Sequence, residues 1–476
     1  MKADTKRCYI HIALVLTVYL IQLQASAPRI LFDPAGYYGH ALILVRDGIG
    51  KAVSQTYPMF EPAYGFFLYF ISRLVPQSMW LKTVSVIQLG FLLASALMMA
   101  RLARMTIKTK NWDIAIFYCI ALSPGLMTSA QTLFCEIFSM ICFVLAVYFV
   151  VLIYQNQVKR ISYVLGIMSA LLTGLLILTK AAFWYVAIAT AVTMAVHYLV
   201  IKKQVKPLVY IALYLAISLS LPYAWSKRNE AVYGVRAIST RSALVLASRF
   251  MRSYDHYTFR DWAIGTITAM SERGARAIFK KVNIDYYTWR RENTVGTDYL
   301  IKLAKIHHVP FDKHNLNQLA LIPTFDRLAF KQVLRDILSS GPSQIIKFVL
   351  FGWFAFVNLL YFETINYDTI TIYQNWLENL YDFIPLRIFV RIVLSSFYWI
   401  GICLMIFKTT KQFKTFNDTT KQILFVSFTP LFWFFAVYTL SQANMRYTYT
   451  VAPFYIYLAL IGWSMTIYSK SKNAQG

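Results

Sequence analysis

Charged residues are scarce in this sequence. Asp, Glu, Lys and Arg make up 14% of its 476 residues, whereas an ordinary soluble domain carries about 25%. This deficit excludes a water-soluble fold for most of the chain. Hydrophobic residues make up 58% and form runs of about 20 residues, the length with which a helix crosses the hydrocarbon core of a bilayer.

Cysteines and ligand-binding patterns are also few. All five cysteines lie in or beside apolar runs, so neither a disulfide framework nor a thiolate metal site is expected. The adjacent His307 and His308 match no metal-binding spacing. A P-loop, a dinucleotide fingerprint and a Gly-rich phosphate cradle are all missing, which argues against a cytosolic nucleotide as the direct energy source. We predict no cofactor, and dependence on a divalent metal stays open.

The apolar runs predict an all-α polytopic membrane protein, because lipid offers no hydrogen-bonding partner to an exposed backbone. About ten or eleven transmembrane helices are expected. The clearest spans lie near 8–25, 83–100, 112–128, 131–154, 161–179, 181–201, 207–225, 387–407, 422–440 and 450–469, with a less clear one at 344–362.

Three regions are expected along the chain. Residues 1–225 form an N-terminal transmembrane catalytic module that includes a first outer loop, 26–82. Within this loop the apolar stretch 59–75 carries charged residues and a proline, which predicts a helix lying in the membrane interface. Residues 226–343 form a small, mainly helical extracytoplasmic domain, and 344–476 form the C-terminal transmembrane helices.

The net charge of +26 comes largely from basic clusters between the spans. Positive-inside bias explains such clusters, so nucleic acid is not a predicted partner. With the N-terminus in the cytoplasm, the loop 26–82 and the segment 226–343 both face outside. The latter holds 19 Lys/Arg and 10 Asp/Glu, a net +9, which favours an anionic acceptor or lipid head groups as neighbours. The one Asn-x-Ser/Thr sequon, at Asn417, falls in a loop predicted inside, which favours a bacterial inner membrane over the endoplasmic reticulum.

Two carboxylates stand out because ionisable groups near membrane depth are costly and often functional. Asp33 opens the first outer loop before Pro34, and it is equally well explained as a turn former or helix cap. Glu136 lies within Leu133–Phe138 and needs a partner there. A structural carboxylate is the favoured explanation for Glu136.

Three cations are predicted on the same outer side: Lys180, Arg228 and Arg446. Each alone is most simply a snorkelling side chain. Their expected convergence with the two carboxylates favours a functional role instead. A carboxylate that accepts a proton beside cations that hold a phosphate suits the transfer of a group from a phosphorylated carrier. Without a nucleotide-binding motif, that carrier would be lipid-borne.

The order of short motifs resembles that of the GT-C superfamily, polytopic glycosyltransferases such as aminoarabinose transferases and protein O-mannosyltransferases. The likeness runs from about residue 8 to 469. It is carried by Asp33 with Tyr37 and Ala41, Tyr57–Tyr64 with Glu61, Ser123–Pro124, Glu136, Leu178–Lys180, Trp225–Asn229, Tyr233–Gly234, Arg446–Tyr447 and Pro453. Two departures occur: Pro34 follows Asp33 where an Asp-Glu pair is frequent, and Ala181-Ala182 replace the common Gly-Pro.

The resemblance implies an inverting glycosyltransferase that moves a sugar from polyprenyl phosphate to a glycolipid, lipopolysaccharide or protein at the outer membrane face. It implies Asp33 as the base, and Lys180, Arg228 and Arg446 as the groups that hold the leaving phosphate. Further candidate site residues are Tyr37, Glu61, Glu136 and Tyr447.

Two other functions also fit the sequence. An O-antigen polymerase or ligase also combines many spans with a large basic outer loop, and its chemistry would use loop arginines. A lipid-linked-sugar flippase or transporter is the second, although the sequence contains no inverted repeat and no matched pair of Gly/Pro-broken spans.

Overall fold

The structure, a computed structural model, describes residues 2–25, 28, 30, 33–55, 60–106, 111–155, 159–240, 246–247, 280, 295–309, 322–357, 384–412, 416–440 and 445–473. These residues form helices joined by turns, and no strand occurs among them. The prediction of an all-α protein is confirmed.

Seven helical stretches of the described chain are long and apolar enough to cross a membrane, and each coincides with a predicted span. They are Gln77–Thr106, Glu136–Tyr154, Arg160–Thr179, Phe183–Ile201, Lys206–Tyr233, Asp418–Tyr438 and Thr448–Ile467. The elements that form them are η1 (Gln77–Met79), α4 (Trp80–Thr106), α7 (Glu136–Gln155), α8 (Lys159–Thr179), α9 (Phe183–Val196), η2 (His197–Ile201), α10 (Lys206–Tyr233), α21 (Asp418–Leu440), η3 (Met445–Val451) and α22 (Ala452–Asn473).

The predicted span 112–128 is broken rather than continuous. It consists of α5 (Trp112–Ala121) and α6 (Pro124–Gln131), and the two apolar helices are bent by 42°. Pro124 explains the break, because it lacks a backbone N–H and keeps Ser123 out of the helical region. Ser123 is accordingly extended, with φ −62° and ψ 114°. Counting the bent pair as one span gives eight.

Helices also cover the three remaining predicted spans. These are α1 (Lys2–Ala25), α18 (Pro342–Val357) and α20 (Ile384–Gln412). The apolar part of α1, Tyr9–Gln24, is shorter than the seven spanning stretches. The end of the predicted span 344–362 lies outside the described residues.

The helices divide into a buried centre and a periphery. In the apolar window of Thr448–Ile467, 78% of the residues are buried inside the protein, against 11% for Phe183–Ile201 and for Lys206–Tyr233. The peripheral helices expose large apolar side chains such as Val200, Val209 and Leu213. Outward-facing apolar side chains of this kind suit contact with lipid, which agrees with an integral membrane protein.

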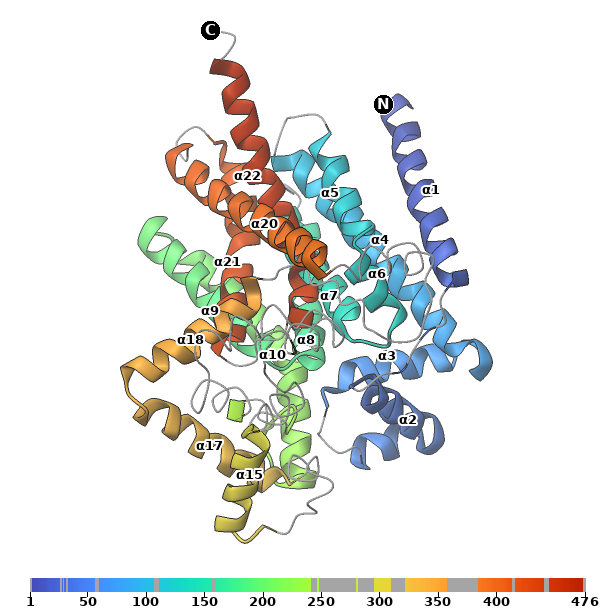
Figure 1. Cartoon of the computed structure of the whole chain (residues 1–476), viewed down its shortest axis with the longest axis vertical. Helices are drawn as coiled ribbons and strands as arrows, with labels where there is room; N and C mark the ends of the chain where they lie inside the picture. The colour runs from blue at the N-terminus through green and yellow to red at the C-terminus, as the bar shows by residue number, and fades with distance from the viewer. Residues whose placement is uncertain are drawn as a thin grey trace.

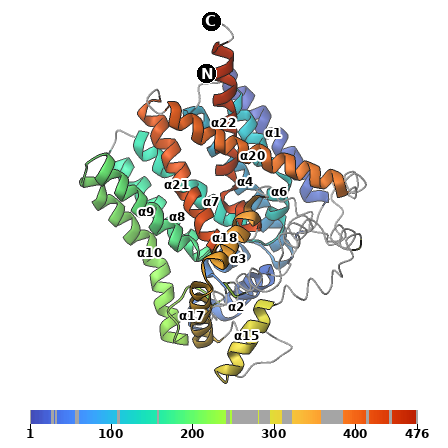
Figure 2. The same ribbon diagram turned by 60° about the vertical axis from the view of Figure 1, so that its left-hand side comes forward.

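Figures 1 and 2 show that the molecule has two distinct ends. The N- and C-termini lie together at the upper end. The lower end holds α2 (Asp33–Gln55) and α3 (Pro62–Ser72) of the first loop, together with α15 (Val295–Ile306) and α17 (Pro323–Ser339). The loop 26–82 and the segment 226–343 therefore contribute helices to the end opposite the termini, as the charge pattern predicts. Their outward orientation, and the domain boundaries, stay predictions.

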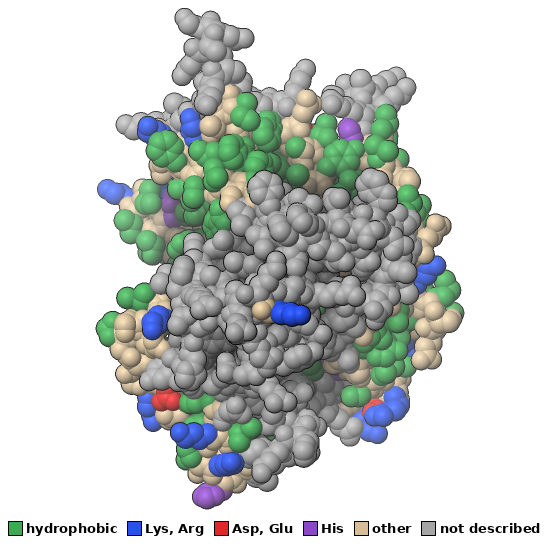
Figure 3. Space-filling model, viewed as in Figure 1, with side chains coloured by type: hydrophobic (Ala, Val, Ile, Leu, Met, Phe, Trp, Pro, Cys, Tyr) green, Lys and Arg blue, Asp and Glu red, His purple; other side chains and the backbone are tan. Residues whose placement is uncertain are grey.

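The described surface differs between the two ends (Figure 3). Hydrophobic side chains cover much of the upper part on this face. Basic side chains occur at both ends, while the visible acidic side chains lie in the lower part beside basic ones. A mixed-charge surface at the lower end is the kind that faces water.

The first loop is packed onto the bundle by its apolar residues. Tyr64, Leu68 and Ile71 on α3 are buried in a cluster with Tyr37 of α2 and Trp80 at the start of α4. The helix predicted in 59–75 is present as α3, and its position in the membrane interface stays a prediction. Packing against α2 and α4 fixes Tyr37 and the N-terminal end of α3 beside the transmembrane helices.

Helix α10 runs past the predicted boundary at residue 225 and ends at Tyr233. Gly234 follows in the left-handed region with φ 71°, a conformation that glycine adopts without strain at a helix end. The Trp225–Asn229 motif therefore lies on the last turns of a helix, and its side chains have helical spacing.

Candidate functional site

A buried glutamine holds the turn that precedes α7. Gln88 of α4 donates through Nε2 to the carbonyl oxygens of Ala130, at 2.8 Å, and Thr132, at 3.3 Å. Its Oε1 accepts a hydrogen bond of 2.9 Å from the Tyr64 hydroxyl. Buried backbone carbonyls need such partners. Gln88 thereby satisfies the end of α6 and fixes the approach to Glu136.

Glu136 and Lys180 form a buried ion pair. Glu136 is the first residue of α7, where the helix dipole stabilises a negative charge. Lys180 lies in the turn between α8 and α9, and its Nζ is 3.3 Å from Glu136 Oε1. The two side chains are only 5% and 1% exposed. The apolar surroundings of Glu136 in the sequence predicted that it needs a partner. Lys180 is that partner.

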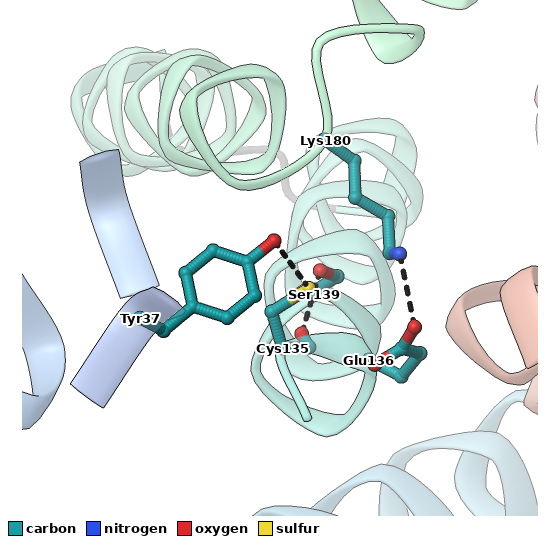
Figure 4. A network of polar contacts seen from close by, with 5 residues as sticks. All are labelled: Tyr37, Cys135, Glu136, Ser139 and Lys180. Atoms are coloured by element: carbon teal, nitrogen blue, oxygen red, sulfur yellow. Dashed lines mark hydrogen bonds and ion pairs between the residues drawn. The ribbon is translucent and has the colours of Figure 1, made fainter. Parts of the chain in front are cut away.

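Tyr37 approaches the same place from α2 (Figure 4). The Cys135 thiol lies 3.5 Å from the Tyr37 hydroxyl oxygen and donates to it, while Ser139 holds the Cys135 carbonyl at 2.7 Å. Burial raises the pKa of Tyr37 well above its ordinary value, and the nearby Cys135, Glu61 and Glu136 raise it further. The phenol is therefore a neutral hydrogen-bonding group beside the ion pair.

Glu61 connects the first loop to the chain beyond α10. It occupies the N-cap position of α3 without a side-chain cap hydrogen bond. Its Oε1 instead accepts a hydrogen bond of 3.3 Å from the Ser239 hydroxyl. Because Glu61 also raises the Tyr37 pKa, the two groups share one electrostatic environment.

Arg228 sits at the C-terminal end of α10 and faces α2. Its guanidinium donates to the Val53 carbonyl of α2 and, at 2.7 Å, to Asn229 Oδ1. The same group lies over the rings of Trp225 and Tyr233, with its carbon 4.9 Å and 5.2 Å from their centroids. Aromatic faces attract a guanidinium and hold it in place. These four neighbours fix the orientation of Arg228.

His40 is a buried histidine close to Arg228. Burial, together with the nearby charge of Arg228, lowers the pKa of His40 to about 4. Its ring packs edge-on against Phe66 at 5.5 Å, and it lies against Gly65, where a side chain would meet Nδ1. His40 is therefore neutral at physiological pH.

The structure brings some of the predicted site residues together. Tyr37, Glu136 and Lys180 belong to one network, and Glu61 adjoins it through its electrostatic effect on Tyr37. Arg228 lies on α10, and the hydrogen bonds described above join it to α2 and to its own helix.

The remaining predictions concern residues whose side chains lie outside the described part of the structure. Asp33 is the first residue of α2, and Arg446 and Tyr447 lie in η3. Helix η3 packs against α7, which begins with Glu136. The convergence of Asp33 and Arg446 on the site stays a prediction.

Sequence reasoning assigned no role to four residues that the structure places here: His40, Cys135, Asn229 and Ser239. Three of them lie in or directly beside motifs quoted above, but their roles depend on contacts between distant segments. Among the described residues, no cluster of three His, Cys, Asp or Glu side chains could hold a metal ion.

No protein-family model and no curated protein sequence matches the chain. Several solved structures are similar to it. They include the apo oligosaccharyltransferase of Archaeoglobus fulgidus, with a TM-score of 0.47, 12% identity and coverage of 98% of this chain and 52% of that one. The complex of Archaeoglobus fulgidus AglB with an inhibitory peptide and a dolichol-phosphate has a TM-score of 0.42 and 11% identity at the same coverage.

ArnT from Cupriavidus metallidurans in the apo state is also similar, with a TM-score of 0.39, 13% identity and coverage of 96% of this chain and 78% of that one. The chain spans about half the length of the archaeal oligosaccharyltransferases.

Proposed function

We propose that this protein is an inverting glycosyltransferase that transfers a sugar from a polyprenyl-phosphate carrier to an acceptor at the extracytoplasmic face of the membrane. The observation that carries the proposal is the network of Tyr37, Glu136 and Lys180, which joins three separate sequence motifs (Figure 4). A buried cation beside a membrane-embedded helix end suits a lipid-borne phosphate.

In the proposed reaction the acceptor oxygen bonds to the anomeric carbon as the bond from that carbon to the phosphate oxygen breaks. Asp33 takes the proton of the acceptor hydroxyl, and the leaving polyprenyl phosphate keeps the electron pair. Lys180, Arg228 and Arg446 stabilise the negative charge that grows on this phosphate. Tyr447 follows Arg446 in the chain and is a further candidate contact.

Glu136 has a distinct part in this scheme. An ammonium at 5% exposure needs a compensating charge nearby. The Glu136 carboxylate, 3.3 Å away, compensates and positions the Lys180 ammonium that is proposed to meet the phosphate. Glu136 is therefore proposed as a group that maintains the site, and Asp33 as the base.

The acceptor is proposed to be a glycolipid, a lipopolysaccharide or a protein in the envelope of a bacterium, with the enzyme in the inner membrane. A position at the outer face suits both substrates, because the lipid carrier remains in the bilayer while the acceptor approaches from the aqueous side. The segment 226–343, with its net charge of +9, suits an anionic acceptor or anionic lipid head groups.

The test is sugar transfer by the purified protein from a polyprenyl-phosphate donor in detergent, comparing wild type with Asp33→Asn. Asn caps a helix about as well as Asp but cannot accept the proton. Because general-base catalysis contributes roughly 10²–10⁴ in rate, we expect the variant to be nearly inactive while still binding the donor. Wild-type transfer by Asp33→Asn would remove Asp33 as the base. A wild-type protein that polymerises or ligates preassembled glycans, or only moves the lipid, would instead support one of the two other functions.

A further inference from the structure

The chain directly after α10 turns back onto the helix it has just left. Gly234 adopts φ 71° and reverses the chain, and the Val235 N–H contacts the Asn229 carbonyl oxygen at 3.4 Å. Val235 and Ile238 are buried, and Ile238 joins the main apolar core. We call residues 234–240 the return segment. The burial of Val235 and Ile238 shows that this segment is part of the packed structure at the end of α10.

Asn229 holds the return segment by its side chain. The residue is fully buried, and its Nδ2 donates to the carbonyl oxygens of Ala237, at 2.7 Å, and Ile238, at 3.3 Å. Its Oδ1 accepts from Arg228 at 2.7 Å. A side-chain amide supplies the two N–H donors and the acceptor oxygen that these three contacts use. Asp has no donor for the two carbonyls, and an apolar residue lacks both functions.

The far end of the return segment contacts the first loop. Ser239, which directly follows Ile238, donates to Glu61 Oε1 at 3.3 Å. The negative charge of Glu61 in turn reaches Tyr37. A continuous chain of contacts therefore leads from Arg228 through Asn229 and the return segment to Glu61.

We propose that Asn229 is a positioning residue that fixes Glu61 and Arg228 relative to one another through the return segment. This inference rests on the proposed function, in which Arg228 holds the leaving phosphate. Glu61 belongs to the first loop, which is distant in sequence from Arg228. Contacts between that loop and the end of α10 are therefore needed to fix the position of Glu61 relative to Arg228. A displacement of about 1 Å at a reacting group can lower the rate about 10²-fold. Losing the hydrogen bonds by which Asn229 holds the return segment, which we call the Asn229 clasp, is therefore expected to lower turnover.

The test uses full-length Asn229→Asp, with Lys227→Gln as the matched control on the same helical turn. Lys227 forms an exposed pair with Glu230 at 2.7 Å. The carboxylate introduced by Asn229→Asp would still accept from Arg228, but it would set a negatively charged oxygen against two carbonyls. We expect amide hydrogen exchange at 235–240 to become about tenfold faster, turnover to fall about 10²-fold, and the KM for the lipid donor to change little. Lys227→Gln should leave all three unchanged.

Ser239 supplies a second, milder variant in case Asn229→Asp does not fold. Ser239→Ala removes the hydroxyl that donates to Glu61 and is expected to lower turnover, while Ser239→Thr keeps a hydroxyl and should recover most of it. If amide hydrogen exchange at 235–240 is unchanged in Asn229→Asp, Asn229 does not hold the return segment. If exchange becomes faster while turnover is unchanged, Asn229 holds the segment but does not position the site. Equal turnover in Ser239→Ala and wild type would also contradict the positioning role. A wild-type protein that transfers no sugar overturns the proposed function. Hydrogen exchange alone then tests whether Asn229 holds the return segment.

Discussion

At the scale of single residues, the pair of Glu136 and Lys180 is expected to dominate the stability of the site. Both side chains are buried, so removing one partner leaves an uncompensated charge, which typically costs about 3–5 kcal/mol. We predict a loss of this size for Glu136→Gln in denaturant unfolding in detergent. The double variant Glu136→Leu/Lys180→Met, which removes both charges, should regain most of it.

Glu230→Gln is the matched control for this substitution, because it makes the same chemical change in the exposed pair with Lys227. Exposed pairs contribute little to stability, so the unfolding transition should hardly move. An equal loss in Glu136→Gln and Glu230→Gln would show that the Glu136 carboxylate is not held in a buried pair.

His40 predicts a pH dependence of stability. Its pKa is lowered to about 4 in the folded protein, against about 6.5 when unfolded. The unfolded chain therefore binds a proton first as the pH falls. The free energy of unfolding that this difference contributes is fully present above about pH 6.5 and is lost progressively as the pH falls to about 4. The complete loss amounts to about 3 kcal/mol. His40→Leu should lack this share of the acid-side loss in unfolding measured from about pH 7 to about pH 4. Identical pH slopes would contradict a neutral, buried His40.

At the scale of elements, the contact between α2 and α3 depends on a glycine. A Cβ at Gly65 would lie 2.2 Å from His40 Nδ1, and the buried ring has little room to move. We expect Gly65→Ala to destabilise the protein by about 1–3 kcal/mol. Gly39→Ala on α2, where a Cβ meets nothing within 4 Å, should be neutral or slightly stabilising in the same thermal unfolding assay.

The double variant Gly65→Ala/His40→Ala separates a steric effect from a general intolerance of alanine in α3. Removing the ring removes the clash, so the double variant should be less destabilised than the sum of the two single changes. Strict additivity would place the cause elsewhere than in the contact between His40 and Gly65.

Hydrophobicity predicted the helices because each span in lipid must form its backbone hydrogen bonds within its own helix. This requirement depends only on a run of consecutive apolar residues, which the sequence shows directly. It did not predict the break at Ser123–Pro124, since the run 112–128 is apolar on both sides of the proline. It also placed the end of α10 too early, because Lys227, Arg228 and Glu230 read as the start of a hydrophilic segment.

The site was less accessible from the sequence than the helices. The apolar surroundings of Glu136 predicted that it needs a partner, but sequence alone could not identify Lys180 as that partner, 44 residues away. Asn229 lies in a quoted motif, yet its role depends on a chain reversal at Gly234. Ser239 carries no signal of its own, because its contact with Glu61 spans 178 residues.

At the scale of the whole molecule, the two ends seen in Figure 1 predict a labelling pattern. A single cysteine at the exposed Arg335, on α17 at the lower end, should react with an impermeant thiol reagent from the outside of intact cells. A cysteine at the exposed Lys203 should react only after permeabilisation. The native cysteines are replaced beforehand, because Cys403 is exposed. Labelling of positions 203 and 335 from the same side would contradict this topology.

The length of α10 sets the depth at which a lipid-borne substrate would be met. Its 28 residues span about 42 Å at about 1.5 Å per residue, whereas a bilayer's hydrocarbon core is about 30 Å thick. With Lys206 at one hydrocarbon boundary, Arg228 lies about 33 Å further along the helix axis, at the level of the opposite head groups. In the proposed reaction, a polyprenyl phosphate anchored by its tail would reach this guanidinium at its own resting height, without being lifted from the membrane or drawn into it.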